Sequence, residues 1–392
     1  MPRYRVARQD DFDFLSPAYQ ALYDRSPATL FQHPVWLDRL YGTLAVARNA
    51  QPVVVTVRDA ERDAQDELVG VLPLVRRRRR GIRRLEFADL GVCDYAAPVL
   101  DREHIDALLS DSTACRDIRT SLGRFDLLQV ERLAGSGAAM ATLVDATATR
   151  RHSYDTHPIT LPSTPAGWPD EIADANLIRR LERSRKRLRP RGGATLRLVT
   201  DTAEVDALME RMQGFRRDRF SGRRAVDLVQ DPDCFEFYRR AAHDGIVGGG
   251  PTQLAVLDVG GEPAAIALDL ADADQHLYVL VGYDIARLRN CSLGLVIVDE
   301  LIRSAVADGL RTFDLTVGNE GYKSDFGARP TPMYAVRVAA TVRGRAAAAA
   351  ADLDAVARGM AKRGLAAQAR LVGRARATRS RKHGKAPPIL AR

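Results

Sequence analysis

Four side chains that could transfer a proton or stabilise a negative charge lie within one short segment, DLTVGNEGYKSDFGA. The segment begins in an expected strand at 312–317 and continues beyond it. Asp314 and Glu320 could accept a proton, Tyr322 could supply one, and Lys323 could stabilise a phosphate or a developing oxyanion. The segment is too polar and too rich in glycine for a simple connection between two elements. An equally weighted alternative gives Asp314 a structural role, which is to hold the loop that carries Tyr322 and Lys323.

Lys323 is unusual because almost every positively charged side chain in this sequence is an arginine. Of its 59 basic residues only five are lysine, and residues 1–345 contain just Lys186 and Lys323. A compact ammonium acts as a point charge that a planar guanidinium does not always replace. The position therefore indicates a functional lysine, with a chance surface lysine as the alternative.

A second chemical segment, GYDIARLRNCSLGLVIVDELI, joins an expected strand at 276–283 to an expected helix at 292–307. The strand ends at Tyr283, and the helix opens with Ser292, Leu293, Gly294 and Leu295. The unpaired amides at such a helix start, together with the helix dipole, suit a phosphate or pyrophosphate. Ser292 is also an ordinary helix N-cap residue, so a capping role alone is the competing interpretation.

The elements that position these residues occur in the same order twice. The first half predicts strands at 52–59, 67–75 and 82–90, a helix from about 101 and a strand at 125–131, and the second half predicts strands at 253–259, 264–271 and 276–283, a helix at 292–307 and a strand at 312–317. The repeated order predicts a duplicated domain. A linker rich in Pro, Thr and Ser at 145–169 divides the chain, so we expect domains at 1–160 and 161–345 and a basic helical tail at 346–392.

The net charge of +9 resides in that tail, because residues 346–392 carry eight Arg and three Lys against two Asp. The neutral remainder argues against a protein that binds nucleic acid with its whole surface. The tail could contact an RNA, an acidic partner or an anionic lipid surface, or it could simply be solvated. The cluster at 216–220, RRDRF, is interpreted as a solvated helix end.

Other classes of chemistry have little support in the sequence. The four cysteines and seven histidines show no metal-ligand spacing, so no metal is expected, and no Gly-x-Ser-x-Gly motif of a serine hydrolase is present. No apolar run reaches the roughly 18–20 residues needed to cross a bilayer, and the first residues, MPRYRVARQDDFDF, do not form a signal peptide. We therefore expect a cytoplasmic protein.

Several segments of the sequence, taken together, resemble a known family. They are LFQHPVWLDRL, LVGVLPLVRRRRRGIRRLEF and GVCDYAAPVL in the first half, and the stretch from YDIARLRNCSLGL to the Tyr-Lys-x-x-Phe-Gly ending in the second. Over residues 10–340 the chain resembles the FemAB-like, cellulose-biosynthesis (CelD-type) branch of the Gcn5-related N-acetyltransferase (GNAT) superfamily. The family usually has Ser-Pro-Gly at the helix start, where this chain has Ser292-Leu293-Gly294.

The resemblance implies an α/β (α+β) fold with two tandem GNAT domains, each a mixed, mostly antiparallel sheet flanked by helices. It implies an acyltransferase that uses acetyl-CoA or another acyl-CoA as co-substrate, bound by the second domain at Tyr283, Ser292, Leu293, Gly294 and Leu295. The acceptor, the amine of an amino sugar or another small molecule, would enter between the domains. Asp94 of the first domain matches an Asp-Tyr pair of the family and joins Asp314, Glu320, Tyr322 and Lys323 as a candidate catalytic residue.

Two other functions remain open at this point. FemAB relatives use aminoacyl-tRNA as donor, and the basic helix expected at 178–191 and the tail would suit RNA phosphates. Against this, the sequence shows no dense set of aromatic residues on which single-stranded RNA could stack. A non-catalytic protein that binds a polyanion or a membrane surface is the third possibility, and the Tyr322-Lys323 segment argues against it. The oligomeric state is not predicted.

Overall fold

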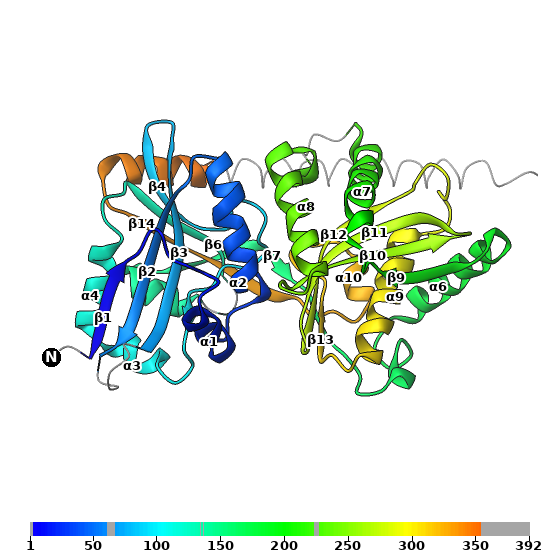
Figure 1. Cartoon of the computed structure of the whole chain (residues 1–392), viewed down its shortest axis with the longest axis horizontal. Coiled ribbons are helices and arrows are strands. Elements are labelled where there is room, and N and C mark those ends of the chain that lie inside the picture. Colours follow the sequence, from blue (N-terminus) through cyan, green and yellow to red (C-terminus); the bar gives the residue numbers. More distant parts are fainter. Residues whose placement is uncertain (1–2, 61–66, 134, 136, 223–226, 354–392) are drawn as a thin grey trace, which may run out of the picture.

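The computed structural model describes residues 3–60, 67–133, 135, 137–222 and 227–353. They form two mixed β-sheets, each flanked by helices, that lie side by side along the long axis of the molecule (Figure 1). The first sheet has the strand order β1-β2-β3-β4-β6-β14-β7, with β5 paired to β3. The second has the order β8-β13-β12-β11-β10-β9.

The first sheet is built from β1 (Tyr4–Arg8), β2 (Gln51–Asp59), β3 (Glu67–Arg79), β4 (Ile82–Phe87), β5 (Val99–Leu100), β6 (Leu127–Leu133), β7 (Thr149–Thr156) and β14 (Thr331–Ala339). The second is built from β8 (Pro158–Thr160), β9 (Ala194–Leu198), β10 (Thr252–Val259), β11 (Glu262–Ala271), β12 (Gln275–Tyr283) and β13 (Thr312–Asp314). The first domain carries helices α1 (Pro17–Arg25), α2 (Pro34–Arg39), α3 (Ile105–Ser110), α4 (Ser112–Ser121) and α5 (Ala138–Val144). The second carries α6 (Ala175–Leu188), α7 (Val205–Phe220), α8 (Pro232–Ile246), α9 (Leu293–Ala307) and the short α10 (Tyr322–Asp325).

The two sheets repeat one pattern of pairing, which confirms the duplicated α/β fold. In each sheet four consecutive strands pair antiparallel, β1 to β4 in the first and β9 to β12 in the second. The next pairing is parallel, between β4 and β6 in one sheet and between β12 and β13 in the other. A parallel pair needs a crossover connection, and helices α3–α4 and α9 provide it.

The last strand of each repeat crosses to the other sheet, so the domain limits differ from those expected. Strand β8 follows the first repeat but pairs with β13 in the second sheet. Strand β14 follows the second repeat but pairs with β6 and β7 in the first. Residues 158–160 therefore belong to the second sheet and 331–339 to the first, whereas the sequence analysis placed the divisions after 160 and 345. The composition of the linker does not show which sheet a short strand joins.

Helices cover both faces of the second sheet. Along β10, Leu254 and Val256 face a core shared with α7 and α8, and Ala255 and Leu257 face a core shared with α6 and α9, as the two-residue period of a strand requires. Helix α7 packs so closely on β12 that a Cβ at Gly282 would lie 2.6 Å from the Met212 carbonyl oxygen. Met209 and Met212 are fully buried there, as the helical pattern predicts.

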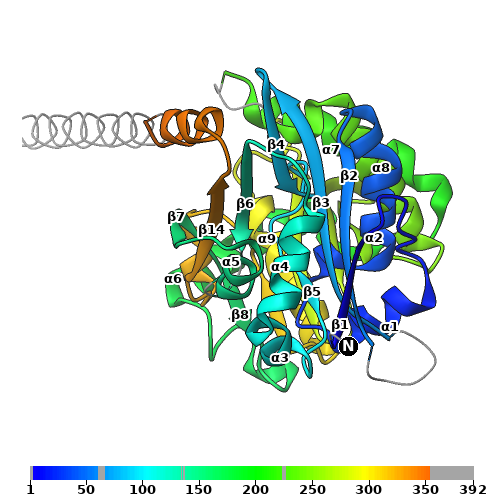
Figure 2. The same ribbon diagram turned by 90° about the vertical axis from the view of Figure 1, so that its left-hand side faces the viewer.

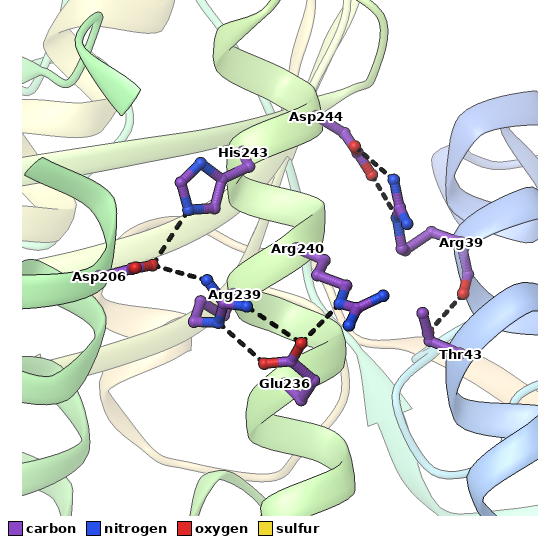
Figure 3. Close-up of polar contacts among 8 residues, drawn as sticks. All are labelled: Arg39, Thr43, Asp206, Glu236, Arg239, Arg240, His243 and Asp244. Carbon is purple, nitrogen blue, oxygen red and sulfur yellow. Dashed lines mark hydrogen bonds and ion pairs between the residues drawn. The ribbon is translucent and has the colours of Figure 1, made fainter. Parts of the chain in front are cut away.

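The two domains share one hydrophobic core. The Trp36 ring of α2 meets the Phe237 ring of α8 edge to face, with 4.9 Å between the ring centroids. At the rim of this contact Arg39 donates two hydrogen bonds of 2.7 Å to the Asp244 carboxylate, as Figure 3 shows between the two helices. Helix α8 is also tied to α7, because His243 and Arg239 both contact Asp206 (Figure 3). Figure 2 shows the molecule along its long axis, with the first sheet toward the viewer.

Residues 342–353 begin a helix after β14, in which Asp352 pairs with Arg150 and Arg337. All eleven basic residues of the tail expected at 346–392 lie outside the described residues. Among the described helices, none combines the length and apolar character required to cross a membrane.

Candidate active site

The site begins where two parallel strands separate. Strands β12 and β13 pair only over 275–277 and 312–314. Beyond that point β12 continues to Tyr283. The segment after β13 turns away from it at Leu315, whose amide donates to the His157 carbonyl. The outer half of β12 therefore has a strand partner on one side only, and a ligand could lie along its open edge.

A cavity of about 400 Å³ occupies this opening. Its walls come from the outer half of β12, the loop 284–289, the start of α9, and one residue each from α6, α7 and α10. All five residues expected to bind the donor line it, namely Tyr283, Ser292, Leu293, Gly294 and Leu295, and so does Tyr322. The structure thus brings together the two chemical segments that the sequence singled out.

Three arginines give the cavity a positive charge. Arg180, Arg219 and Arg289 line it, against a single carboxylate, that of Asp284. Arg180 lies 3.5 Å from Asp325 at the surface. Within the described residues no carboxylate pairs with Arg219 or Arg289. Guanidinium groups without a carboxylate partner beside a helix start suit the phosphates of a nucleotide.

Gly294 is explained by an aromatic ring. A Cβ at this position would lie 2.9 Å from Cε1 of Tyr283, so only glycine lets the ring rest on the start of α9. The Arg219 guanidinium lies over the same ring, 4.9 Å from its centroid. Tyr283 thus holds α7, β12 and α9 together at the cavity wall.

Ser292 precedes α9 but does not cap it. Its side chain makes no capping hydrogen bond, and its φ of +49° lies in the left-handed region that favours glycine. The capping interpretation of Ser292 is therefore wrong. Ser292 itself lines the cavity, and its carbonyl accepts hydrogen bonds from the amides of Leu295 and Val296.

Tyr322 lines the same cavity and retains its proton. Burial, and secondarily the nearby Glu320 carboxylate, raise the pKa of its phenol to about 12. The hydroxyl is therefore a proton donor at neutral pH.

Lys323 lies outside the cavity lining and is only 3% exposed. Its ammonium donates to the carbonyls of Thr316 and Val317, at 3.2 and 2.9 Å, and lies 3.1 Å from a carboxylate oxygen of Glu320. Glu320 is more than half exposed and pairs with Lys323. The geometry gives Lys323 the role of fixing the backbone at 316–317.

Thr316 connects the cavity to a polar cluster between the domains. Its hydroxyl donates to the carbonyl of Tyr278, a cavity residue, at 3.0 Å, and its amide donates to Asp314 at 2.8 Å. Its φ is +54°, which is costly for a β-branched residue. Lys323 and Asp314 together hold this conformation.

Asp314 is buried at the junction of the two domains. It accepts hydrogen bonds from the Tyr95 hydroxyl at 2.6 Å and from the Thr156 hydroxyl at 3.2 Å, both of the first domain. Burial raises the pKa of its carboxyl, and the hydrogen bonds offset part of that effect. These contacts favour the structural role of Asp314 that the sequence left open.

Asp94 lies on the first-domain side of this cluster and is partly exposed, at 21% of its side chain. Burial raises the pKa of its carboxyl, while Arg132, 3.9 Å away, acts in the opposite direction. The Thr316 hydroxyl and the Lys323 ammonium also lower the pKa of this carboxyl. Asp94 is therefore the carboxylate of the cluster that combines partial exposure with a raised pKa.

Sequence reasoning missed the arginines and Tyr278 of the cavity. Arg219 belongs to the cluster interpreted as a solvated helix end, and that interpretation is wrong for two of its members. Arg219 lines the cavity, and Arg216 donates to the Val281 carbonyl and pairs with Asp227. The sequence shows that the cluster ends a helix. It does not show that this helix end lies beside the cavity. In the described part of the chain, no group of three His, Cys, Asp or Glu residues is arranged to hold a metal ion.

Residues 175–324 match the family model described as the acetyltransferase (GNAT) domain. This part of the second domain is similar to a GNAT domain. The matched residues contain α6, the whole cavity, the segment that opens α9 and the other chemical segment as far as Ser324, so the chain is an enzyme of the acyltransferase class. No relative among curated proteins matches the sequence.

Solved structures are similar in fold to most of the chain, beyond the residues that match the family model. FemX is 10% identical, with a TM-score of 0.55, over 80% of this chain and 94% of FemX. L-PGS from Bacillus licheniformis is 11% identical, with a TM-score of 0.52, over 83% of this chain and 93% of that one. A conserved protein of unknown function from Bacteroides thetaiotaomicron is 7% identical, with a TM-score of 0.51, over 85% of this chain and all of the other. At these identities the likeness shows the fold alone.

Proposed function

We propose that the protein transfers an acyl group from acetyl-CoA or another acyl-CoA to the amine of an amino sugar or another small molecule. The observation that carries the proposal is the cavity between the separated strands, because it combines a helix start, three arginines and an open strand edge. The pyrophosphate would lie at the start of α9 near Arg219 and Arg289. The pantetheine arm would follow the open edge of β12, whose amides would bind the thioester oxygen.

The acceptor would approach from the junction between the domains. Its nitrogen must be uncharged to attack the thioester carbon, and Asp94 is the candidate base because it is partly exposed and ionisable. As the carbon–sulfur bond breaks, the thiolate needs a proton, which Tyr322 would supply from the cavity wall. Thr316 would hold the cavity wall in place relative to the junction between the domains, because it bonds to both Tyr278 and Asp314.

A turnover assay tests this proposal. The full chain is mixed with acetyl-CoA and a panel of amines that includes amino sugars, and release of free CoA thiol is followed together with the mass of the acylated product. We expect product with at least one amine and a loss of turnover in Arg219→Ala. An amino sugar as the best substrate would also support the cellulose-biosynthesis branch of the superfamily.

A second donor class deserves the same assay because the fold likeness includes FemX. Aminoacyl-tRNA would replace acyl-CoA in that case. Product from aminoacyl-tRNA, with none from any acyl-CoA, would reject our preferred donor while retaining the acyltransferase.

A further inference from the structure

Helix α6 carries a dense basic face that the fold does not use. Its inner face contributes Leu177, Leu181 and Leu188 to the core, and Arg185 fastens it to Asp299 and Glu300 of α9. The basic residues exposed on and just after the helix are Arg179, Arg180, Arg183, Lys186, Arg187, Arg189 and Arg191. Glu182 is the acidic residue exposed among them.

Most of these charges have no acidic partner. In the described part of the chain no carboxylate lies within 4.0 Å of Arg179, Arg183 or Lys186, and these three residues share one helix face at spacings of four and three. Like charges at such spacings destabilise a helix. Three like charges that cost helix stability and form no ion pair among the described residues indicate an external anion.

The basic face continues into the cavity mouth. Arg180 lines the cavity, Arg187 donates to the Asn290 carbonyl at 2.6 Å, and Arg191 donates to the Arg287 carbonyl at 3.3 Å, next to the cavity residue Arg289. From there the face follows α6, whose 14 residues span about 21 Å. Helix α6 forms the end of the molecule away from the first domain (Figure 1), so the face is open to a large partner. A bound CoA would be held by the cavity arginines and would leave the rest of the face unused.

The residue types on the outer face of α6 indicate which kind of partner it could bind. The large hydrophobic residues exposed in the described part of the chain all lie elsewhere, and the outer face of α6 holds no aromatic residue. Membrane-bound helices insert apolar side chains, and single-stranded RNA is held by stacking on aromatic ones. A purely charged helix face suits steering and docking of an acidic protein surface.

We propose that the outer face of α6 docks an acidic carrier protein that presents the acyl group as a thioester on its phosphopantetheine arm. The inference rests on the proposed function, because the arm would enter the same cavity that accepts the pantetheine of CoA. In the reaction the acceptor nitrogen bonds to the thioester carbon and the carbon–sulfur bond breaks. The amine proton passes to the base, and the sulfur leaves as the thiol of the carrier's arm.

The test compares two donors that bear the same acetyl group, acetyl-CoA and an acetyl-loaded acyl carrier protein. The variant Arg179→Glu/Arg183→Glu/Lys186→Glu reverses the face without altering any residue that lines the cavity. We expect KM for the loaded carrier protein to rise at least about tenfold and KM for acetyl-CoA to change less than about twofold. The matched control is Arg102→Glu/Arg116→Glu/Arg124→Glu, three exposed arginines of the first domain, for which both KM values should stay unchanged.

The outcomes separate this inference from the proposed function. Turnover with acetyl-CoA but none with the carrier protein overturns the inference alone, as does an equal KM for the carrier protein in the variant and the wild type. Loss of aminoacyl-tRNA turnover in the α6 variant, with no use of the carrier protein, would assign the face to RNA and also overturns it. No turnover with either thioester would instead contradict the proposed function.

Discussion

Tyr322 supplies the clearest test at the level of single residues. Its phenol has a pKa of about 12, so it is protonated throughout the neutral range and can give a proton to the leaving thiolate. We expect Tyr322→Phe to lower kcat about 100-fold, the scale of one general acid, while the Kd for CoA stays within about twofold. Pre-steady-state rates together with CoA titration measure the two quantities. An unchanged kcat would assign Tyr322 to the cavity wall alone.

Asp94 gives a prediction about pH. A base works only when ionised, and burial raises the pKa of this carboxyl, so the acidic limb of kcat/KM should lie above the ordinary carboxyl range. The rate should rise with pH through that limb and then level off. Asp94→Asn should lower kcat/KM at least about 100-fold and abolish the limb. A variant that retains the wild-type pH profile would show that the proton leaves by another route.

The sequence singled out residues that line one cavity because their signal is local. A strand end, a small residue and a helix start are adjacent in the chain, and Tyr283, Ser292 and Gly294 line one cavity. The role of Lys323 was not accessible in this way. Its rarity indicated that a lysine is required, but the carbonyls of Thr316 and Val317 that it binds are exposed by a left-handed turn that sequence does not reveal.

At the level of elements, the strained start of α9 is open to test. Ser292 has a φ of +49° and its side chain makes no capping hydrogen bond, so glycine should relieve strain without loss of a contact. We expect Ser292→Gly to raise the free energy of unfolding by about 0.5–1 kcal/mol and to leave CoA affinity within about twofold. Urea unfolding and calorimetry measure the two effects. A destabilised variant would mean that the serine side chain supports the turn.

The repeat of strands and helices was predictable from periodicity, but the exchange of β8 and β14 was not. Strand β8 is short and pairs with β13, and β14 is irregular in pattern and lies between β6 and β7, so both take their places from strands that are distant in the sequence. Alternation of apolar residues reports which face of a strand is buried. It does not report which sheet the strand joins.

At the scale of the whole molecule, the exchanged strands and the shared core should make the two domains unfold together. Strand β14 leaves the second domain just after α10 and pairs within the first sheet. The core between α2 and α8 links the domains a second time. We expect a single thermal transition in scanning calorimetry, with equal calorimetric and van't Hoff enthalpies. Two separated transitions would show that the domains are thermodynamically independent.

The central claim is that the cavity at the start of α9 binds the acyl donor, and calorimetric titration of CoA into the full chain tests it most directly. Gly294→Glu places a carboxylate at the helix start and displaces the Tyr283 ring, which lies 2.9 Å from the position of the new Cβ. We predict one CoA bound per chain in the wild type and an affinity at least about tenfold weaker in the variant, or roughly 1.4 kcal/mol, with the fold retained. No binding to the wild type, or equal affinity in the two proteins, would contradict the account.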